Sequence, residues 1–235
     1  MDNHTERLAD GVWRVEVGFY VNAYLLANNG ADDTAGLTLV DTGRAKHGPR
    51  LVRSIRLLGF DPRAVGDVLL THWHSDHAGA AARFAQSSAE PRVWAGNDDL
   101  DVVRGDRRPG RGDALPGRMA TFGVDPPPAP VPTVQALDDR QRFDIAGGTT
   151  VVATPGHTPG HCAFWLPQHG VLLAGDALWN VLRFSPMPRV SDADPSAPPT
   201  AIQRFLDCEP AVIGVGHGPP VTSGAVGKLQ RLIAG

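Results

Sequence analysis

Seven residues of the types that bind divalent metals occupy positions near the ends of apolar segments along the chain. They are His72, His74, Asp76, His77, His157, Asp176 and His217. The first four fall within six positions, shortly after the apolar run 68–70. Side chains at the ends of neighbouring strands converge in space, and imidazole combined with carboxylate is the ligand mix that suits ions such as zinc. The sequence therefore predicts a metal centre built from this set.

The spacing within the set predicts how the ligands divide. In a short extended turn, His72 and His74 are two positions apart, so their side chains point the same way and can share one ion. Asp76 and His77 can then turn toward a second ion. His157 lies between two Pro-Gly pairs, whose turns hold the backbone in a fixed geometry. A lone histidine after a strand is usually a surface or core residue, but seven such residues in this pattern exceed what structure alone requires.

Periodicity along the chain predicts both strands and amphipathic helices. We expect two strands within 12–26 with a bend at Gly18, and further strands at 37–40, 68–70, 93–95, 143–145, 149–153, 162–166, 171–174 and 211–215. Helices are expected at 49–58, 78–85, 200–206 and 225–233. The segment 98–132 is rich in Gly, Pro, Arg and Asp and is expected to be an irregular insertion.

Composition limits the partners that such a chain can have. Its 235 residues fit a single domain spanning 1–235. The 22 Lys and Arg against 25 Asp and Glu give a net charge of −3, which disfavours nucleic acid or an anionic membrane and favours a small-molecule substrate. No signal peptide or membrane-spanning apolar run is visible, so a cytoplasmic protein without a membrane anchor is expected. Cys162 and Cys208 lack CxxC spacing and are expected to be free thiols. The sequence does not specify an oligomeric state.

The pattern His-x-His-x-Asp-His, followed by separate His, Asp and His residues, resembles the metallo-β-lactamase superfamily over nearly the whole chain. The resemblance implies an α+β fold, a four-layer αββα sandwich with two metal ions at one edge. It assigns His72, His74 and His157 to the first ion, Asp76, His77 and His217 to the second, and Asp176 to a bridge between them. Asp41, in an Asp-Thr-Gly turn, matches a position that supports the ligand loop in this family, although a simple turn residue is the alternative. His161 has no ligand role in the pattern and is expected to form structural hydrogen bonds.

The resemblance also implies a chemistry. Two divalent cations, expected to be Zn²⁺ with Fe or Mn as alternatives, hold a bridging hydroxide and polarise the substrate carbonyl. Asp76 is the expected catalytic residue, because a carboxylate there can orient the hydroxide and carry a proton to the leaving group. The expected function is therefore a metal-dependent hydrolase that cleaves an ester, thioester or lactone of a small molecule.

Departures from individual subfamilies leave alternatives open. β-Lactamases of the superfamily lack a bridging aspartate, whereas this chain has Asp176. Glyoxalase II-like thioesterases share Thr-Pro-Gly-His and Gly-Asp-Ala-Leu-Trp but carry a C-terminal helical domain, whereas 18 residues follow His217 here. Lactonases place a tyrosine three positions after the bridging aspartate, where this chain has Trp179, which we expect to contact substrate. An iron-dependent oxidoreductase of the persulfide dioxygenase type, a phosphodiesterase, a β-lactamase-like hydrolase and a non-catalytic metal-binding scaffold remain alternatives.

Overall fold

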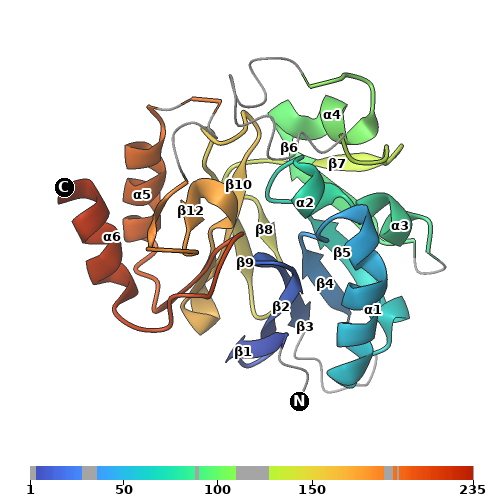
Figure 1. The fold of residues 1–235 in the computed structure, drawn as a ribbon, viewed down its shortest axis with the longest axis horizontal. Helices are drawn as coiled ribbons and strands as arrows, with labels where there is room; N and C mark the ends of the chain where they lie inside the picture. The colour runs from blue at the N-terminus through green and yellow to red at the C-terminus, as the bar shows by residue number, and fades with distance from the viewer. Residues whose placement is uncertain are drawn as a thin grey trace.

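Two β-sheets pack face to face and helices cover their outer surfaces in the computed structural model, which describes residues 4–27, 36–87, 90–109, 127–187, 193–194 and 196–234 (Figure 1). The first sheet has the order β1 (Thr5–Ala9), β2 (Val12–Gly18), β3 (Val21–Ala27), β4 (Leu37–Val40), β5 (Val65–Leu69), β6 (Arg92–Gly96) and β7 (Val134–Leu137). The second has the order β14 (Val212–Gly214), β11 (Val171–Leu173), β10 (Cys162–Leu166), β9 (Thr149–Ala153) and β8 (Arg142–Phe143). A separate short hairpin joins β12 (Leu178–Trp179) to β13 (Ser185–Pro186).

The helices divide between the two outer faces of this sandwich (Figure 1). The first sheet is covered by α1 (Gly48–Leu57), α2 (Ser75–Ala78), α3 (Ala81–Ala85) and α4 (Leu100–Arg104). The second sheet is covered by α5 (Pro198–Asp207) and α6 (Ala225–Ala234). Short 3-10 turns lie at Ala45–His47, Pro62–Ala64, Asn97–Asp99, Pro167–His169 and Gly175–Ala177. In the described part of the chain, no helix is both long and apolar enough to cross a membrane.

Three apolar layers separate the four structural layers. Along β3, Leu25 belongs to the cluster under α1, whereas its neighbour Leu26 belongs to the cluster between the sheets. This strand is therefore buried on both faces, as the period of two dictates for a central strand. Phe205 of α5 and Leu229 of α6 contribute to the third cluster, against the second sheet. The four-layer αββα sandwich expected from the sequence is thus confirmed.

The site lies at one edge of this sandwich because of how the first sheet is connected. Strands β1 to β4 run antiparallel to their neighbours, while β4, β5, β6 and β7 run parallel. Parallel neighbours need crossover connections, so the carboxyl ends of β4, β5 and β6 meet at the same edge. Asp41 follows β4, His72 follows β5 and Asp99 follows β6.

Several local predictions need correction. The helix expected at 78–85 is two short helices, α2 and α3, with a break at Gly79. A Cβ atom at Gly79 would lie 2.8 Å from the Cα of Arg44, so the preceding loop packs directly on this break. The insertion expected at 98–132 begins with a 3-10 turn and α4, and its residues 110–126 lie outside the described part. Strands β1, β7, β12 and β13 were not predicted. Cys162 and Cys208 are free thiols, as expected.

Candidate metal centre

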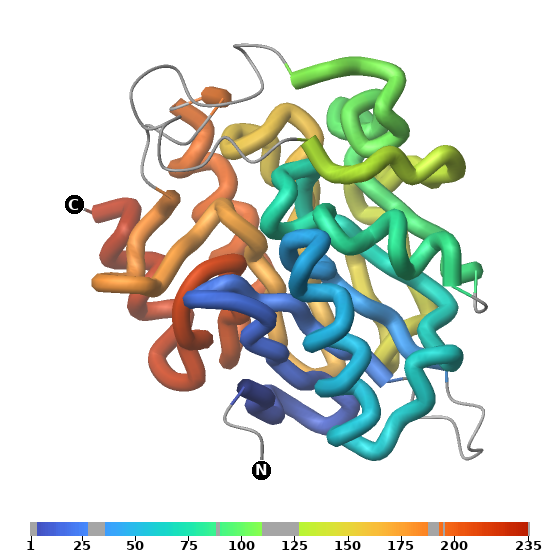
Figure 2. Tube along the Cα trace, turned by 45° about the vertical axis from the view of Figure 1, so that its right-hand side comes forward, coloured from blue at the N-terminus to red at the C-terminus, as the bar shows by residue number. Residues whose placement is uncertain are grey.

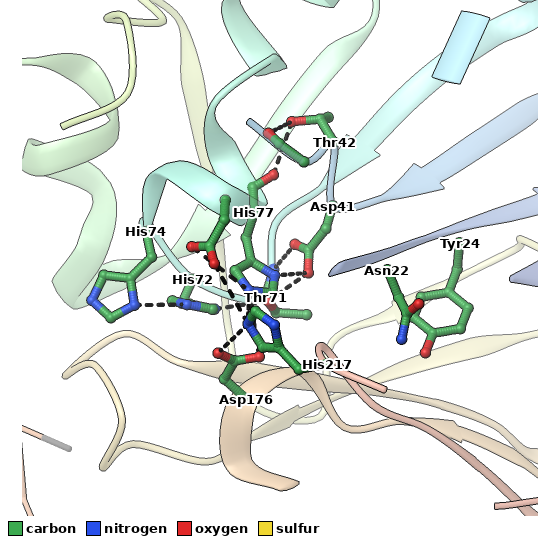
Figure 3. Close-up of polar contacts among 12 residues, drawn as sticks. Asn22, Tyr24, Asp41, Thr42, Thr71, His72, His74, His77, Asp176 and His217 are labelled. Carbon is green, nitrogen blue, oxygen red and sulfur yellow. Dashed lines mark hydrogen bonds and ion pairs between the residues drawn. The ribbon is translucent and has the colours of Figure 1, made fainter. Parts of the chain in front are cut away.

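The seven candidate ligands converge at the carboxyl edge of the first sheet, where loops from both sheets meet. Figure 3 labels His72, His74, His77, Asp176 and His217 among them. His72 and His74 lie on the loop after β5, and Asp76 and His77 lie on α2. The other three belong to the second half of the chain, on the β9–β10 loop, in the 3-10 turn after β11 and on the loop after β14; they are His157, Asp176 and His217. The fold therefore brings together residues up to 145 positions apart, from His72 to His217.

One group of three imidazoles forms one side of the centre. The Nε2 atom of His72 lies 3.0 Å from Nδ1 of His74, and Nε2 of His157 lies 2.9 Å from the same Nδ1. Nitrogen ligands about 2.0–2.1 Å from a tetrahedral ion stand roughly 3.3 Å apart, so these separations are close to those of ligands that share an ion. The group matches the trio that the resemblance assigns to the first ion.

A second group of three lies beside it. Nε2 of His77 lies 3.3 Å from Nε2 of His217, and an oxygen of Asp76 lies 3.5 Å from the latter nitrogen. Asp176 reaches both groups, because its Oδ2 is 3.2 Å from Nε2 of His217 and 3.6 Å from Nε2 of His157. This position between the groups is the one that a bridging carboxylate requires.

Asp41 determines which ring nitrogen of two candidate ligands carries the proton (Figure 3). Its Oδ2 accepts from the hydroxyl of Thr71 at 2.8 Å and lies 2.9 Å from Nδ1 of His77. A carboxylate only accepts, so Nδ1 of His77 carries a proton, and Nε2 is the nitrogen that can present a lone pair to an ion. The Thr71 hydroxyl has already donated its proton, so it accepts from Nδ1 of His72, 3.0 Å away. Nε2 of His72 therefore also presents a lone pair to the centre.

Burial favours the neutral form of two imidazoles in the first group, His72 and His74. It lowers the pKa of His72 well below its usual value, with further lowering from the neighbouring rings of His77 and His74. Burial together with the neighbouring His157 lowers the pKa of His74 to about 3. A neutral imidazole has the free lone pair that a metal ligand needs, so these two rings can bind a cation without first losing a proton.

In the second group, the charges of neighbouring carboxylates determine the direction of the pKa shift of His77. Burial acts to lower the pKa of His77, but Asp176, Asp76 and Asp41 together raise it well above its usual value. Burial likewise acts to raise the pKa of Asp176, but the charges of His217 and His77 hold it well below the ordinary range. Three carboxylates thus stand in a largely buried space and attract positive charge. A proton or a metal cation can supply that charge.

The residues present fit a pair of divalent ions. Within the described residues, Oδ1 of the buried Asp176 has no hydrogen-bond partner, and it lies 3.4 Å from Nε2 of His77, another atom that can bind an ion. An acceptor buried without a donor costs free energy unless a cation completes it. A Cβ atom at Gly216 would lie 1.9 Å from this oxygen, so glycine there leaves the space open.

Asn22 and Tyr24 of β3 hold the loop that carries His217 and were missed by the sequence analysis (Figure 3). The Asn22 amide donates to the carbonyls of Val215 at 2.8 Å and Gly218 at 2.7 Å, and the buried Tyr24 hydroxyl donates to Val215 at 2.7 Å. Figure 2 shows the blue β2–β3 hairpin beside this red loop. The sequence did offer one sign of this role, because Asn22 is a polar residue within an otherwise apolar strand.

Asp99 is a third residue that the sequence analysis missed. It is fully buried, although it lies in the segment expected to be irregular. Its carboxylate accepts from the backbone of Trp73 and Gly160 and from the hydroxyl of Thr158. Burial raises the pKa of Asp99 to about 6, against the lowering effect of these hydrogen bonds. No periodicity in the surrounding sequence marked this position.

His161 forms the structural hydrogen bonds that were expected of it. Its Nε2 accepts from the backbone N–H of Asp176 at 3.1 Å, and its Nδ1 therefore donates to the hydroxyl of Thr154 at 2.8 Å. Burial lowers the pKa of His161 to about 3, so the ring is neutral and can accept. The ring thereby fixes the backbone from which the Asp176 carboxylate projects.

Trp179 lies beside the centre and lines a cleft. Its backbone forms a parallel β-bridge with His217. Together with Leu182, Met187 and Ile202, its side chain lines a cleft of about 520 Å³ between the β12–β13 hairpin, α5 and α6. Leu182 is 91% exposed at the rim. The lining of the cleft is largely apolar. One of its lining residues, Trp179, is paired through its backbone with the candidate ligand His217.

Comparison with known proteins places the chain in a family. Residues 17–221 match the family model of the metallo-β-lactamase superfamily. "Probable metallo-hydrolase YflN" of Bacillus subtilis is 26% identical over 230 residues, which cover 90% of this chain and 81% of that protein. A hydroxyacylglutathione hydrolase of Pseudomonas putida is 33% identical over 128 residues, 53% of this chain and 38% of that protein.

A solved structure agrees with this likeness. The metallo-β-lactamase family protein TTHA1429 from Thermus thermophilus superimposes with a TM-score of 0.69 at 25% identity, covering 97% of this chain and 79% of that one. The family match spans the motif and all the separate His and Asp residues. The chain belongs to the metallo-β-lactamase superfamily.

Proposed function

We propose that this protein is a dinuclear metal hydrolase that cleaves an ester, thioester or lactone of a small molecule. The observation that carries the proposal is the convergence of two ligand groups on either side of Asp176. His72, His74 and His157 would hold one ion, and Asp76, His77 and His217 the other, with Asp176 shared. Zn²⁺ is the ion best suited to this mixture of imidazole and carboxylate, with Fe and Mn as alternatives.

When bound, two such ions supply Lewis-acid chemistry, which activates water and polarises a carbonyl oxygen. The chain's own residues provide the geometry. Asp41 holds a proton on Nδ1 of His77 directly and on Nδ1 of His72 through the Thr71 hydroxyl, so Nε2 of each ring is the nitrogen that would bind an ion. His161 holds the backbone of Asp176 through the 3.1 Å hydrogen bond. His72 and His157 are buried, which limits the access of bulk water to that side of the reacting space.

Asp76 is the residue best placed to move a proton. Its side chain is 21% exposed, whereas those of Asp176 and Asp41 are 4% and 2% exposed. Of these three carboxylates, it is therefore the one that a substrate or a water molecule can approach most freely. We infer that Asp76 accepts a proton from the attacking water and returns it to the leaving group.

Trp179 supports a substrate with an apolar part. The cleft that it lines has apolar walls from the hairpin and from both C-terminal helices, next to the loop of His217. A leaving group or acyl chain that extends from the metal centre would bury apolar surface here. The hydroxyacylglutathione hydrolase relative acts, by its name, on a thioester-type substrate, which favours the same substrate class for this chain.

The proposal is tested with a substrate panel on protein of known metal content. Lactones, thioesters, aryl esters and phosphodiesters would be compared, each with metal-free protein and with protein reconstituted with Zn²⁺. We expect hydrolysis of at least one ester-type substrate that depends on added metal. Oxygen consumption with a persulfide by iron-loaded protein, without hydrolysis of any ester by zinc-loaded protein, would instead support the oxidoreductase alternative.

A further inference from the structure

Asp99 is a buried carboxylate that joins two loops far apart in the sequence. It lies in the 3-10 turn between β6 and α4 and is fully buried. Its Oδ2 accepts from the N–H of Trp73 at 3.1 Å and from the hydroxyl of Thr158 at 2.7 Å. Its Oδ1 accepts from the N–H of Gly160 at 2.9 Å. Both oxygens are thus satisfied by donors from two different loops.

These donors stand next to the first ligand group and to no member of the second. Trp73 lies between His72 and His74 in the sequence, and Thr158 directly follows His157. A displacement of either loop relative to Asp99 would change the distance between His74 and His157, now 2.9 Å between ring nitrogens. Ligand positions must be held within about 0.5 Å for a metal site to keep its affinity.

The close approach of the loops depends on two glycines. A Cβ atom at Gly96 would lie 1.9 Å from the carbonyl oxygen of Gly160, and a Cβ at Gly160 would lie 2.5 Å from the backbone nitrogen of Asp99. Any larger residue at either position would push the segment that carries Asp99 away from the β9–β10 loop. The carboxylate and the glycines therefore form one tight junction.

We propose that Asp99 is a positioning residue that sets the spacing of His72, His74 and His157 and so the affinity of the first ion. This inference rests on the proposed metal-dependent function. Asp41 plays the corresponding part for His77 in the second group, through its 2.9 Å contact with that ring. Asp41 also reaches His72 of the first group through the Thr71 hydroxyl, whereas the hydrogen bonds of Asp99 lie beside the first group alone.

The test is a metal titration of Asp99→Asn. An asparagine retains the shape but has one acceptor oxygen, and its NH₂ group would face a donor. Metal-free protein is titrated with Zn²⁺ against a chromophoric chelator, which resolves two binding constants. We expect one constant to weaken by about 10- to 100-fold, as for loss of a residue that orients a metal ligand, and the other to change by less than about threefold.

Asp67→Asn is the matched control. Asp67 is also a buried carboxylate, and it accepts from Arg92 and from the indole of Trp94 in β6. It contacts none of the candidate ligands through these bonds. We expect it to lower the urea midpoint much as Asp99→Asn does, while both zinc constants stay within about twofold of the unsubstituted protein. A loss of stability in both variants, with weaker zinc binding only in Asp99→Asn, would separate a positioning role from a merely structural one.

Each outcome has a distinct meaning. If the unsubstituted chain does not bind two ions, the proposed function fails. If it binds two and Asp99→Asn changes neither constant, changes both equally or behaves as Asp67→Asn does, the inference about Asp99 is overturned while the proposed function stands.

Should Asp99→Asn not fold, Thr158→Val removes a single donor to the same carboxylate. We then expect the same constant to weaken, by about three- to tenfold, while the other stays unchanged. Equal weakening of both zinc binding constants in Thr158→Val would likewise overturn the inference.

Discussion

Oδ2 of Asp41 lies 2.9 Å from Nδ1 of His77, with both side chains buried at the carboxyl edge of the first sheet. The backbone of Asp41 adopts a left-handed conformation with φ of 60°. An aspartate tolerates this region better than most residues do. Asp41 thus stands in a turn and also contacts a candidate ligand, so its support of the ligand loop is a prediction that substitution can test.

Asp41→Asn should weaken metal binding without removing a ligand. The amide can no longer accept from all three of its donors, which are the backbone and hydroxyl of Thr71 and the ring of His77. We expect zinc affinity to fall by about 10- to 100-fold. Chelator competition measures it, with Asp67→Asn as the control for loss of a buried carboxylate. Unchanged affinity would mean that Asp41 does not orient these rings.

Asp76→Asn should separate proton transfer from metal binding. The amide oxygen can still coordinate an ion, but the side chain no longer accepts a proton. We expect kcat to fall by roughly 10²- to 10⁴-fold while metal content falls far less. Steady-state kinetics and elemental analysis on the same sample measure both. Full kcat with both ions bound would remove the proton-transfer role from Asp76.

Trp179→Ala should change substrate choice rather than chemistry. The substitution removes a wall of the cleft beside His217 without touching a candidate ligand. We expect KM to rise for substrates with large apolar groups, and the order of preferred substrates to change. Trp13→Ala, at an aromatic contact with Phe60 on another part of the chain, is the control. Values of kcat/KM within about twofold for every substrate would identify Trp179 as a packing residue only.

Gly96→Ala should destabilise the fold more than an alanine at an open glycine. The new Cβ would stand 1.9 Å from the carbonyl oxygen of Gly160, so the backbone must move. We expect a loss of about 1–3 kcal/mol in the free energy of unfolding. A Cβ atom at Gly66 meets nothing within 4 Å, and we expect Gly66→Ala to change stability by no more than about 0.5 kcal/mol. Urea unfolding compares the two variants. Equal midpoints for Gly96→Ala and Gly66→Ala would show that the backbone around Gly96 and Gly160 can move apart without loss of stability.

Short-range patterns in the sequence predicted most strands and helices and the candidate ligands, whereas the four-layer arrangement followed from the family resemblance. Strands β9 and β10 were predicted at their observed bounds, since apolar β-formers there are flanked by turn residues. Asp99 and Asn22 escaped prediction because their roles depend on partners 26 to 196 positions away. The break at Gly79 was also missed, because it results from a loop that packs on the helix from outside.

The metal content of the natively purified chain tests the central claim most directly. Elemental analysis should find about two divalent ions per chain. In His157→Ala, metal content should fall and hydrolysis should be lost, because the first group loses one of three nitrogens. His169→Ala, in the turn after β10, should keep both ions and full activity. A fully active chain with one ion or none, or an active His157→Ala variant, would contradict the account.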